Sequence, residues 1–225
     1  MARILCIETA TKVCSVCLAE DGVSIGSRWF ESEKYSHAEK LNLLIQELFQ
    51  ELDLALSDID AVAVSEGPGS YTGLRIGTST AKGICYALDK PLIAINSLKS
   101  LAALSQIESG LVCPLFDARR MEVYAAVFSS NLDLLMETQP VIVDESSFKS
   151  FLAKEKVLFI GPGAEKCSDI IQHQNALFNI DLKVRAEGMT GLAHEAFQKK
   201  TFVNLAYFEP FYLKDFIAGT PKKIF

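Results

Sequence analysis

A glycine-rich stretch that follows an apolar strand is the part of the chain whose residue types and spacing come closest to chemistry. It reads Ser65-Glu-Gly-Pro-Gly-Ser-Tyr-Thr-Gly-Leu-Arg-Ile-Gly77 and leads into a helix. Backbone N–H groups at such a helix start can bind an anion. A nucleotide-binding P-loop needs Lys and then Ser or Thr directly after its last glycine, whereas Leu74 and Arg75 follow Gly73. The motif excludes a P-loop and favours a tight turn that leads into a closely packed helix.

Candidate metal ligands and nucleophiles do not form a recognisable site. His194 has Gln198 four residues later, where a zinc-protease helix has its second histidine. Cys14 and Cys17 have the spacing of metal ligands, but residues three apart on a strand point to opposite faces. No serine or cysteine is paired with an orienting histidine. We therefore predict no metal site, no catalytic residues, and cysteines that are reduced and buried.

The composition excludes several classes of protein. The chain has 225 residues, 49% of them hydrophobic, and a formal net charge of −6. An acidic chain is not expected to grip nucleic acid over a broad surface by itself. No apolar run approaches the roughly 18 residues of a membrane span, and Met1-Ala-Arg leads straight into a strand rather than a signal peptide. We expect a cytoplasmic protein that does not enter a membrane.

The hydrophobic periodicity of the first hundred residues predicts three antiparallel strands and then alternating helices and strands. An apolar stripe from His37 to Leu52 has the period of an amphipathic helix. Ser57 is expected to cap a short helical turn, and Ser70 or Thr72 to cap the helix after the glycine-rich turn. The expected strands are 2–10, 14–20, 24–32, 61–65 and 92–95, and the other expected helix is 97–106.

The remaining residues repeat this plan in part. Three strands again come first, and the aromatic-rich stretch Tyr207–Tyr212 is expected to pack back on the body. Strands that are almost wholly apolar are typical of mixed sheets covered by helices, so the sequence predicts an α/β fold. The expected strands are 112–117, 122–129, 136–143 and 157–160, and the expected helices are 146–154, 166–174 and 190–200.

Four motifs occur in an order that resembles the TsaB (YeaZ) family of glycoprotease-like proteins. They are Ile7-Glu-Thr-Ala-Thr11, the stretch 66–77, Phe116-Asp-Ala-Arg119 with Glu122-Val-Tyr124, and Glu209-Pro-Phe-Tyr-Leu213. The resemblance implies two ribonuclease-H-like domains of the actin-like ATPase superfamily, with mixed sheets flanked by helices. The first would span residues 1–99, the second, reduced one residues 100–205, and a segment 206–225 would pack back on the body.

The resemblance also implies a function. The chain would be a noncatalytic scaffold or activator in the bacterial synthesis of threonylcarbamoyladenosine (t6A) in tRNA. It would bind the transferase TsaD as a heterodimer, with TsaE in the ternary complex, and would self-associate as a homodimer through the same helices. It would meet tRNA only indirectly, through the complex. No cofactor would be required, although ATP or ADP could bind weakly or at the partner interface.

Two carboxylates stand where ATPases of the superfamily organise Mg²⁺ and hold phosphate. Glu8, with Thr9 and Thr11 beside it, lies in the turn after the first strand, and Asp117 lies at the matching place in the second half. By this resemblance the four residues would be a vestigial nucleotide cleft. The alternative is that Glu8 and Asp117 only cap turns at the mouth of an interdomain cleft.

The expected partner contacts lie on two helices. Long apolar side chains form a ridge on the first, and small residues four apart allow close approach to the second. By the resemblance this surface docks TsaD. Which face of each helix points outward is left open, because each helix must also cover its own sheet. The residues expected at the contact are Leu41, Leu44, Ile45, Leu48, Gly73, Gly77 and Ala81.

Two alternative functions follow from the same fold or motifs. A stand-alone ATPase or kinase would bind Mg·ATP and lose it in Glu8→Ala or Asp117→Ala. A metallopeptidase would need stoichiometric zinc. Metal-bearing relatives carry two histidines four apart on the first long helix, but this chain has His37 and then Leu41, so the second ligand is missing.

Overall fold

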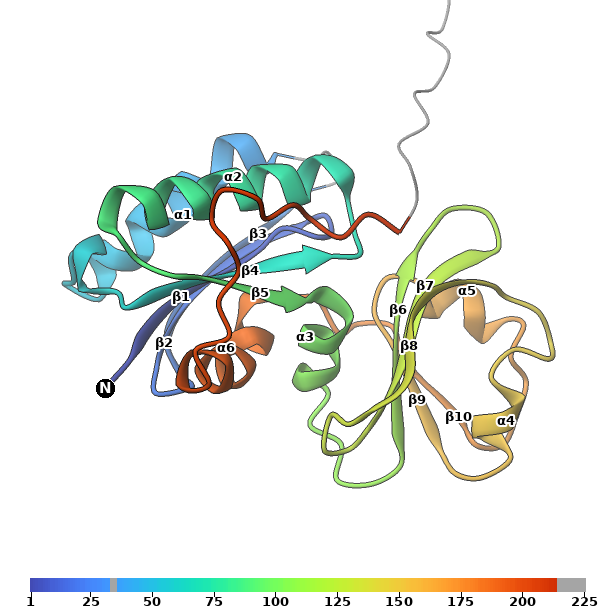
Figure 1. The fold of residues 1–225 in the computed structure, drawn as a ribbon. Coiled ribbons are helices and arrows are strands. Elements are labelled where there is room, and N and C mark those ends of the chain that lie inside the picture. Colours follow the sequence, from blue (N-terminus) through green and yellow to red (C-terminus); the bar gives the residue numbers. More distant parts are fainter. Residues whose placement is uncertain (33–35, 214–225) are drawn as a thin grey trace, which may run out of the picture.

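The structure is a computed structural model that describes residues 1–32 and 36–213. Two five-stranded mixed sheets lie side by side, each flanked by helices (Figure 1). The strands of the first sheet are β1 (Arg3–Glu8), β2 (Val13–Glu20), β3 (Val23–Glu31), β4 (Ala61–Gly67) and β5 (Leu92–Asn96). Those of the second are β6 (Leu111–Asp117), β7 (Glu122–Ser129), β8 (Leu134–Ile142), β9 (Val157–Ile160) and β10 (Ala176–Asn179).

Both sheets have the same topology. The order is β3-β2-β1-β4-β5 in the first, and the second, read from its other edge, is β8-β7-β6-β9-β10. In each, the first three strands are antiparallel, and the last two run parallel to the first strand. This is the expected fold class, two ribonuclease-H-like domains with mixed sheets flanked by helices.

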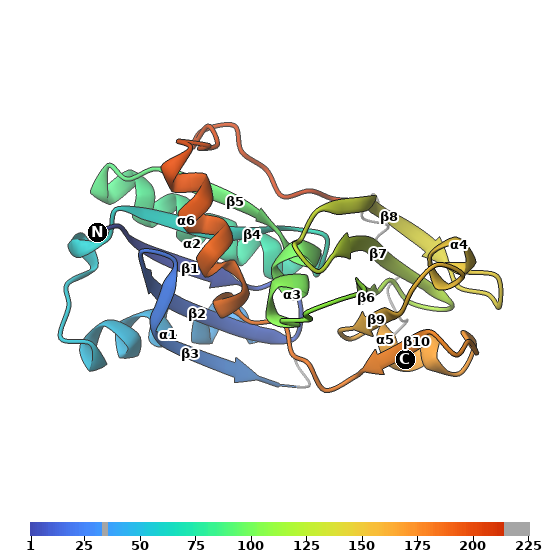
Figure 2. The same ribbon diagram turned by 90° about the horizontal axis from the view of Figure 1, so that it is seen from below.

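Helices cover both faces of the first sheet, and three shorter helices pack against the second sheet. On one face of the first sheet lie α1 (His37–Glu51), the short turn η1 (Leu56–Asp58) and α2 (Tyr71–Leu88). On the opposite face lie η2 (Ala186–Met189) and α6 (Thr190–Gln198), as Figure 2 shows from below. The other helices are α3 (Ser97–Leu104), between the sheets, and α4 (Lys149–Leu152) and α5 (Ala164–Ser168), which pack on the second sheet.

The alternation of β1 explains why its residues are apolar on both faces. Leu5 and Ile7 pack on the side of α1 and α2, whereas Ile4 and Cys6 pack with residues of η2 and α6. All four side chains are fully buried. A strand that is covered on both faces needs no polar side, so it reads as a continuous apolar run.

The chain does not divide at the boundary that we expected near residue 205. Ala186, Met189 and Ala193 pack on the first sheet with Ile4 and Ile93, so η2 and α6 belong to the first structural unit. Residues 203–212, which we call the C-terminal strap, follow along the same unit, starting with a bridge between Val203 and Leu92. The second unit is therefore an insertion around β6–β10, and residues 214–225 of the expected 206–225 segment lie outside the described residues.

Several local expectations were wrong. The helices expected at 146–154 and 166–174 are reduced to α4 and α5, with four and five residues. The strand β10 was not predicted. The turn η1 is not capped by Ser57: its N-cap is Ala55, whose N–H donates to Asp58 at 2.9 Å.

An apolar cluster joins the two sheets. Ala10 and Leu74 of the first unit belong to the same buried cluster as Phe116 and Ile160 of the second, with Leu101 of α3 among them. In the described part of the chain, no helix is long and apolar enough to cross a membrane.

Candidate functional site

The glycine-rich turn brings the start of α2 against the turn that follows β1. Ser70 caps the helix by accepting a hydrogen bond from the N–H of Gly73 at 3.2 Å. Gly67 has a φ of +117°, which suits only glycine. Gly69 has no positive φ, but a Cβ there would lie 2.5 Å from the carbonyl oxygen of Ala10. The first glycine is therefore required by backbone conformation and the second by close approach.

Two of the three glycines inside α2 are explained by the same turn. A Cβ on Gly73 would lie 2.1 Å from the carbonyl oxygen of Thr9, and one on Gly77 would lie 2.2 Å from its Oγ1. No side chain fits at these distances. The close approach that the glycine spacing indicated is thus made within the chain, between α2 and residue 9, rather than to another molecule.

The seven residues expected to contact a partner are buried in the chain itself, and that expectation needs correction. The side chains of the four α1 residues and of Ala81 pack in the core cluster of the first sheet, because a helix places its most apolar stripe against its own core, and Gly73 and Gly77 lie against Thr9. Only Ile45 also reaches the floor of the groove described next. The seven are Leu41 (1% exposed), Leu44 (7%), Ile45 (6%), Leu48 (0%), Gly73, Gly77 and Ala81 (0%).

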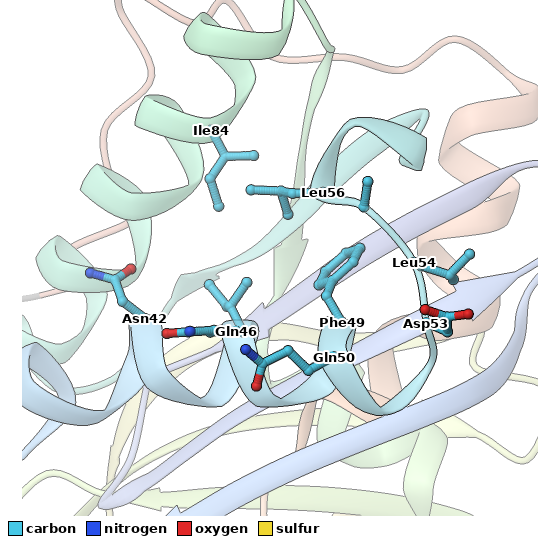
Figure 3. A pocket seen from close by; sticks show the side chains of 10 residues that line it. Asn42, Gln46, Phe49, Gln50, Asp53, Leu54, Leu56 and Ile84 are labelled. Atoms are coloured by element: carbon cyan, nitrogen blue, oxygen red, sulfur yellow. The ribbon is translucent and has the colours of Figure 1, made fainter.

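A groove of about 720 Å³ lies between α1, η1 and the C-terminal half of α2. Figure 3 shows Phe49 of α1, Leu56 of η1 and Ile84 of α2 directed toward one another across it. The amide side chains of Gln46 and Gln50 stand along its α1 side. The groove therefore has an apolar floor and a polar rim.

The outward faces of α1 and α2 carry residues that the sequence reasoning missed. Leu43 is 48% exposed and Tyr86 84% exposed. Gly83 lies in the helix interior, and a Cβ there would meet nothing within 4 Å, so nothing in the described chain explains why it is glycine. With Ser79 and Ala87 it forms an exposed run of small residues four apart. Spacing alone does not distinguish this run from Gly73, Gly77 and Ala81; burial does.

Glu8 is a fully buried carboxyl group at the end of β1. Its Oε1 accepts the N–H of Ala10 at 2.7 Å. Burial raises its pKa from 4.5 to about 7, although hydrogen bonds from Ala10, Ser65 and Thr9 oppose the rise. Within the described residues, its Oε2 and the Oγ1 of Thr9 have no hydrogen-bond partner, and neither atom is accessible to solvent. Glu8 therefore holds its own turn and does not face an open cleft.

Thr11 completes the same turn. Its Oγ1 accepts the N–H of Val13 at 3.2 Å, and its carbonyl oxygen lies 2.7 Å from Nε2 of His37. Because a carbonyl only accepts, His37 donates from Nε2, and burial lowers the pKa of this imidazole. His37 thus ties the start of α1 to the turn after β1.

Asp117 stands at the equivalent end of β6 in a different environment. Its side chain is 53% exposed, and its Oδ1 lies 2.6 Å from Nζ of Lys166. It also accepts the N–H of Arg119 at 2.8 Å. Asp117 is already paired with the Lys166 ammonium, and Glu8 is buried, so the arrangement of the two carboxylates does not fit a Mg²⁺–nucleotide site.

The other candidate ligands also lie apart. Among the described residues, no three His, Cys, Asp or Glu side chains gather in a way that could hold a metal ion. All six cysteines are buried free thiols. Burial raises the pKa of Cys14 and of Cys17 to about 12, so their thiolates are disfavoured at neutral pH.

The C-terminal strap lies along α2 and the glycine-rich turn. The N–H of Phe211 donates to the carbonyl oxygen of Glu66 at 2.6 Å. Arg75 stacks on Tyr71 with its guanidinium 4.1 Å from the ring centre, and donates to the Tyr212 hydroxyl at 3.2 Å. Lys82 donates to the carbonyl oxygens of residues 206 and 208. The strap fixes one side of α2 and leaves the groove side open.

Comparisons of sequence agree with this geometry. The family model described as "TsaD: tRNA N6-adenosine threonylcarbamoyltransferase" matches residues 31–221. The tRNA threonylcarbamoyladenosine biosynthesis protein TsaB of Escherichia coli is 30% identical over 96% of this chain and 96% of its own length. TsaB of Bacillus subtilis is 34% identical over 61% of this chain, and the match spans 59% of that protein.

Comparisons of structure agree as well. Two solved structures from Pseudomonas aeruginosa, one described as YeaZ and one as an uncharacterized protein similar to peptidase YEAZ, have TM-scores of 0.81 and 0.84. Both are 27% identical over 95% of this chain and 100% of theirs. The activator of 2-hydroxyisocaproyl-CoA dehydratase from Clostridium difficile, 12% identical with a TM-score of 0.52 over 89% of this chain and 96% of that one, shares the fold alone. The chain belongs to the TsaB (YeaZ) family of tRNA threonylcarbamoyladenosine biosynthesis proteins.

Proposed function

We propose that the chain is a noncatalytic subunit of t6A synthesis that docks a TsaD-type threonylcarbamoyltransferase on the outward face of α1 and α2. Its relatives are named as biosynthesis proteins for this nucleoside. The observation that carries the docking face is Gly83, which lies in the interior of α2 with open space around it and directly precedes Ile84, a residue that lines the 720 Å³ groove. An exposed helical glycine costs about 1 kcal/mol relative to alanine, so a close contact outside the chain accounts for it.

The surroundings of Gly83 favour a helix as the docked element. A run of small residues four apart lets a second helix approach closely, and a groove with an apolar floor receives its larger side chains. Leu43 of α1 and Tyr86 of α2 add exposed apolar area to the same two helices. The same surface serves self-association as a homodimer when the transferase is absent, and TsaE joins the assembled pair as a third component. tRNA is bound by the assembled complex.

The docking proposal is tested with one substitution and its matched control. Gly83→Leu fills open space in the isolated chain and improves helix propensity, so the fold remains intact. In the complex it overpacks the contact, and we expect affinity for the transferase and t6A formation to fall by about tenfold or more. Gly191→Leu is the control, because Gly191 of α6 also has open space around it but lies on the opposite face of the first sheet.

The readouts are pull-down affinity and t6A formed on tRNA in a reaction with the other purified components. If Gly83→Leu binds and supports synthesis as well as the Gly191→Leu control, the docking face lies elsewhere. If the other components form as much t6A without the chain as with it, the proposed role as a subunit is wrong.

We also propose that the chain needs no nucleotide of its own. The support is the closed environment of Glu8 and the ion pair between Asp117 and Lys166. The double variant Glu8→Gln/Asp117→Asn is expected to support t6A formation at the rate of the unmodified chain. A loss of synthesis in a complex that still assembles would mean that these carboxylates act in the reaction or in nucleotide sensing.

A further inference from the structure

The turn between β6 and β7 places two consecutive arginines in an unfavourable backbone conformation. Arg119 has a φ of +69° and Arg120 a φ of +51°. The N–H of Glu122 donates to the carbonyl oxygen of Arg119 at 3.2 Å and closes a tight turn. Residues other than glycine, asparagine and aspartate rarely adopt positive φ, because their side chains crowd their own backbone there. Strain of this kind persists where the surrounding structure enforces it, and it is concentrated at functional sites.

Lys166 of α5 holds this turn in place. Its Nζ donates to Oδ1 of Asp117 at 2.6 Å, to the carbonyl oxygen of Arg120 at 2.9 Å and to that of Glu122 at 2.6 Å. All three ammonium hydrogens are used, and the side chain is only 21% exposed. The turn is therefore rigid, and the Asp117 carboxylate pairs with Lys166 rather than with either arginine.

The two guanidinium groups are available for an external anion. Both arginines are exposed, and within the described residues neither side chain takes part in a hydrogen bond or an ion pair. The turn reads Asp117-Ala-Arg-Arg-Met-Glu122, and with Lys166, which pairs with Asp117, its formal balance is one positive charge on a chain whose net charge is −6. Figure 1 shows the β6–β7 turn rising from the second sheet on the same side as α1 and α2.

We propose that Arg119 and Arg120 form a phosphate-contact tip that binds the RNA backbone of the tRNA on which the complex acts. This inference rests on the proposed function, because the docked transferase would hold the tRNA on this side of the molecule. Guanidinium groups pair with phosphates through two parallel hydrogen bonds. A nucleic-acid backbone offers regularly spaced phosphates to two adjacent arginines, and such phosphate contacts supply much of the affinity between proteins and nucleic acids. The tip adds affinity and orientation and reads no base.

The test removes both charges without endangering the fold. Asn and Gly are the residue types that best tolerate the positive φ found at these two positions, so Arg119→Asn/Arg120→Gly relieves backbone strain and leaves the fold intact. Lys154→Gln/Lys156→Gln is the matched control: it removes the same charge from exposed residues that precede β9, at the opposite end of the second sheet. Binding of labelled tRNA is measured by fluorescence anisotropy between 50 and 200 mM salt, with the isolated chain and with the assembled complex.

We expect the tip variant to lower tRNA affinity on the order of tenfold per lost contact near 0.1 M salt, and to flatten the slope of log K against log salt by about 1.4 to 1.8. The lysine control is expected to leave both values unchanged. Equal slopes for the tip variant and the unmodified chain would overturn the proposal. Weaker transferase binding without tRNA would also overturn it, because the tip would then contact the protein partner.

The two proposals fail in distinguishable ways. If the chain does not bind the transferase, the proposed function fails. The phosphate-contact tip is then tested by the salt dependence of tRNA binding to the isolated chain. A flatter salt slope of the tip variant in the isolated chain would keep the phosphate contact, and an unchanged slope would exclude it.

Discussion

The two halves of the molecule share one strand order but are covered differently. In the first, α1 and α2 have 15 and 18 residues and leave an outward face with a groove. In the second, α4 and α5 have four and five residues, and the exposed feature is a braced turn. A repeated topology therefore does not repeat a function, because function depends on the elements laid over the sheet.

The equivalent carboxylates show the same contrast on a smaller scale. Glu8 is fully buried and holds its own turn through Ala10, whereas Asp117 is half exposed and paired with Lys166. Each is the last residue of the first strand of its sheet. Burial makes one a titrating group near neutral pH, and solvent leaves the other a surface ion pair.

The sharpest test of the first half compares two neighbouring leucines on α1. Leu44→Asp buries a charge in the core and is expected to lower the free energy of unfolding by about 4 kcal/mol or more, enough to unfold the domain. Leu43→Asp, at a side chain 48% exposed, is expected to change it by about 0.5 kcal/mol. Urea denaturation followed by circular dichroism measures both. Similar losses for the two variants would show that the outward face of α1 is assigned incorrectly.

The buried carboxylate predicts a pH dependence of stability. Because the pKa of Glu8 rises from 4.5 to about 7 on folding, the unfolded chain releases this proton first. Its contribution is fully present below about pH 4.5 and is lost as the pH rises to about 7. Relative to Glu8→Gln, which keeps the acceptor for Ala10, the unmodified chain is expected to lose roughly 3 kcal/mol between pH 4.5 and 8.

Urea titrations at several pH values measure this difference. The matched change in the second half, Asp117→Asn, removes a half-exposed ion pair and is expected to cost about 1 kcal/mol or less. A constant difference between Glu8→Gln and the unmodified chain across the pH range would contradict the burial argument.

The smallest expected effects distinguish the glycines of α2. Gly73→Ala drives a Cβ into the Thr9 carbonyl and is expected to destabilise the chain by about 2 kcal/mol. Gly83→Ala meets open space and is expected to stabilise it by about 0.5 to 1 kcal/mol. Thermal unfolding of the two variants measures whether each substitution lowers or raises the stability of the chain. Destabilisation by Gly83→Ala would mean that this glycine already has a contact within the chain.

Much of the fold was predictable because its signals are local. Strand β7 and strand β9 begin and end at the expected residues, and the duplicated strand plan follows from apolar runs and turn residues. Helices were expected where α4 and α5 lie, but they were expected to be longer, and β10 was not expected at all. Four or five residues carry too little hydrophobic period to define an element, whereas the four residues of β9 were recognisable because all of them are apolar. The return of α6 to the first sheet joins residues more than a hundred positions apart, for example Ala193 and Ile4, and no local pattern encodes such a contact.

In the candidate site, the sequence determines which types of residue each helix carries, and the tertiary structure determines which of them are buried. By itself, the sequence determined that α1 is amphipathic, that α2 carries small residues, and which family the motifs resemble. It did not determine which glycines face inward, because Gly73, Gly77 and Gly83 differ only in what lies opposite them in space. Nor could it assign different environments to Glu8 and Asp117. Burial is a property of the whole packed chain, and burial decided which residues stabilise the fold and which remain for a partner.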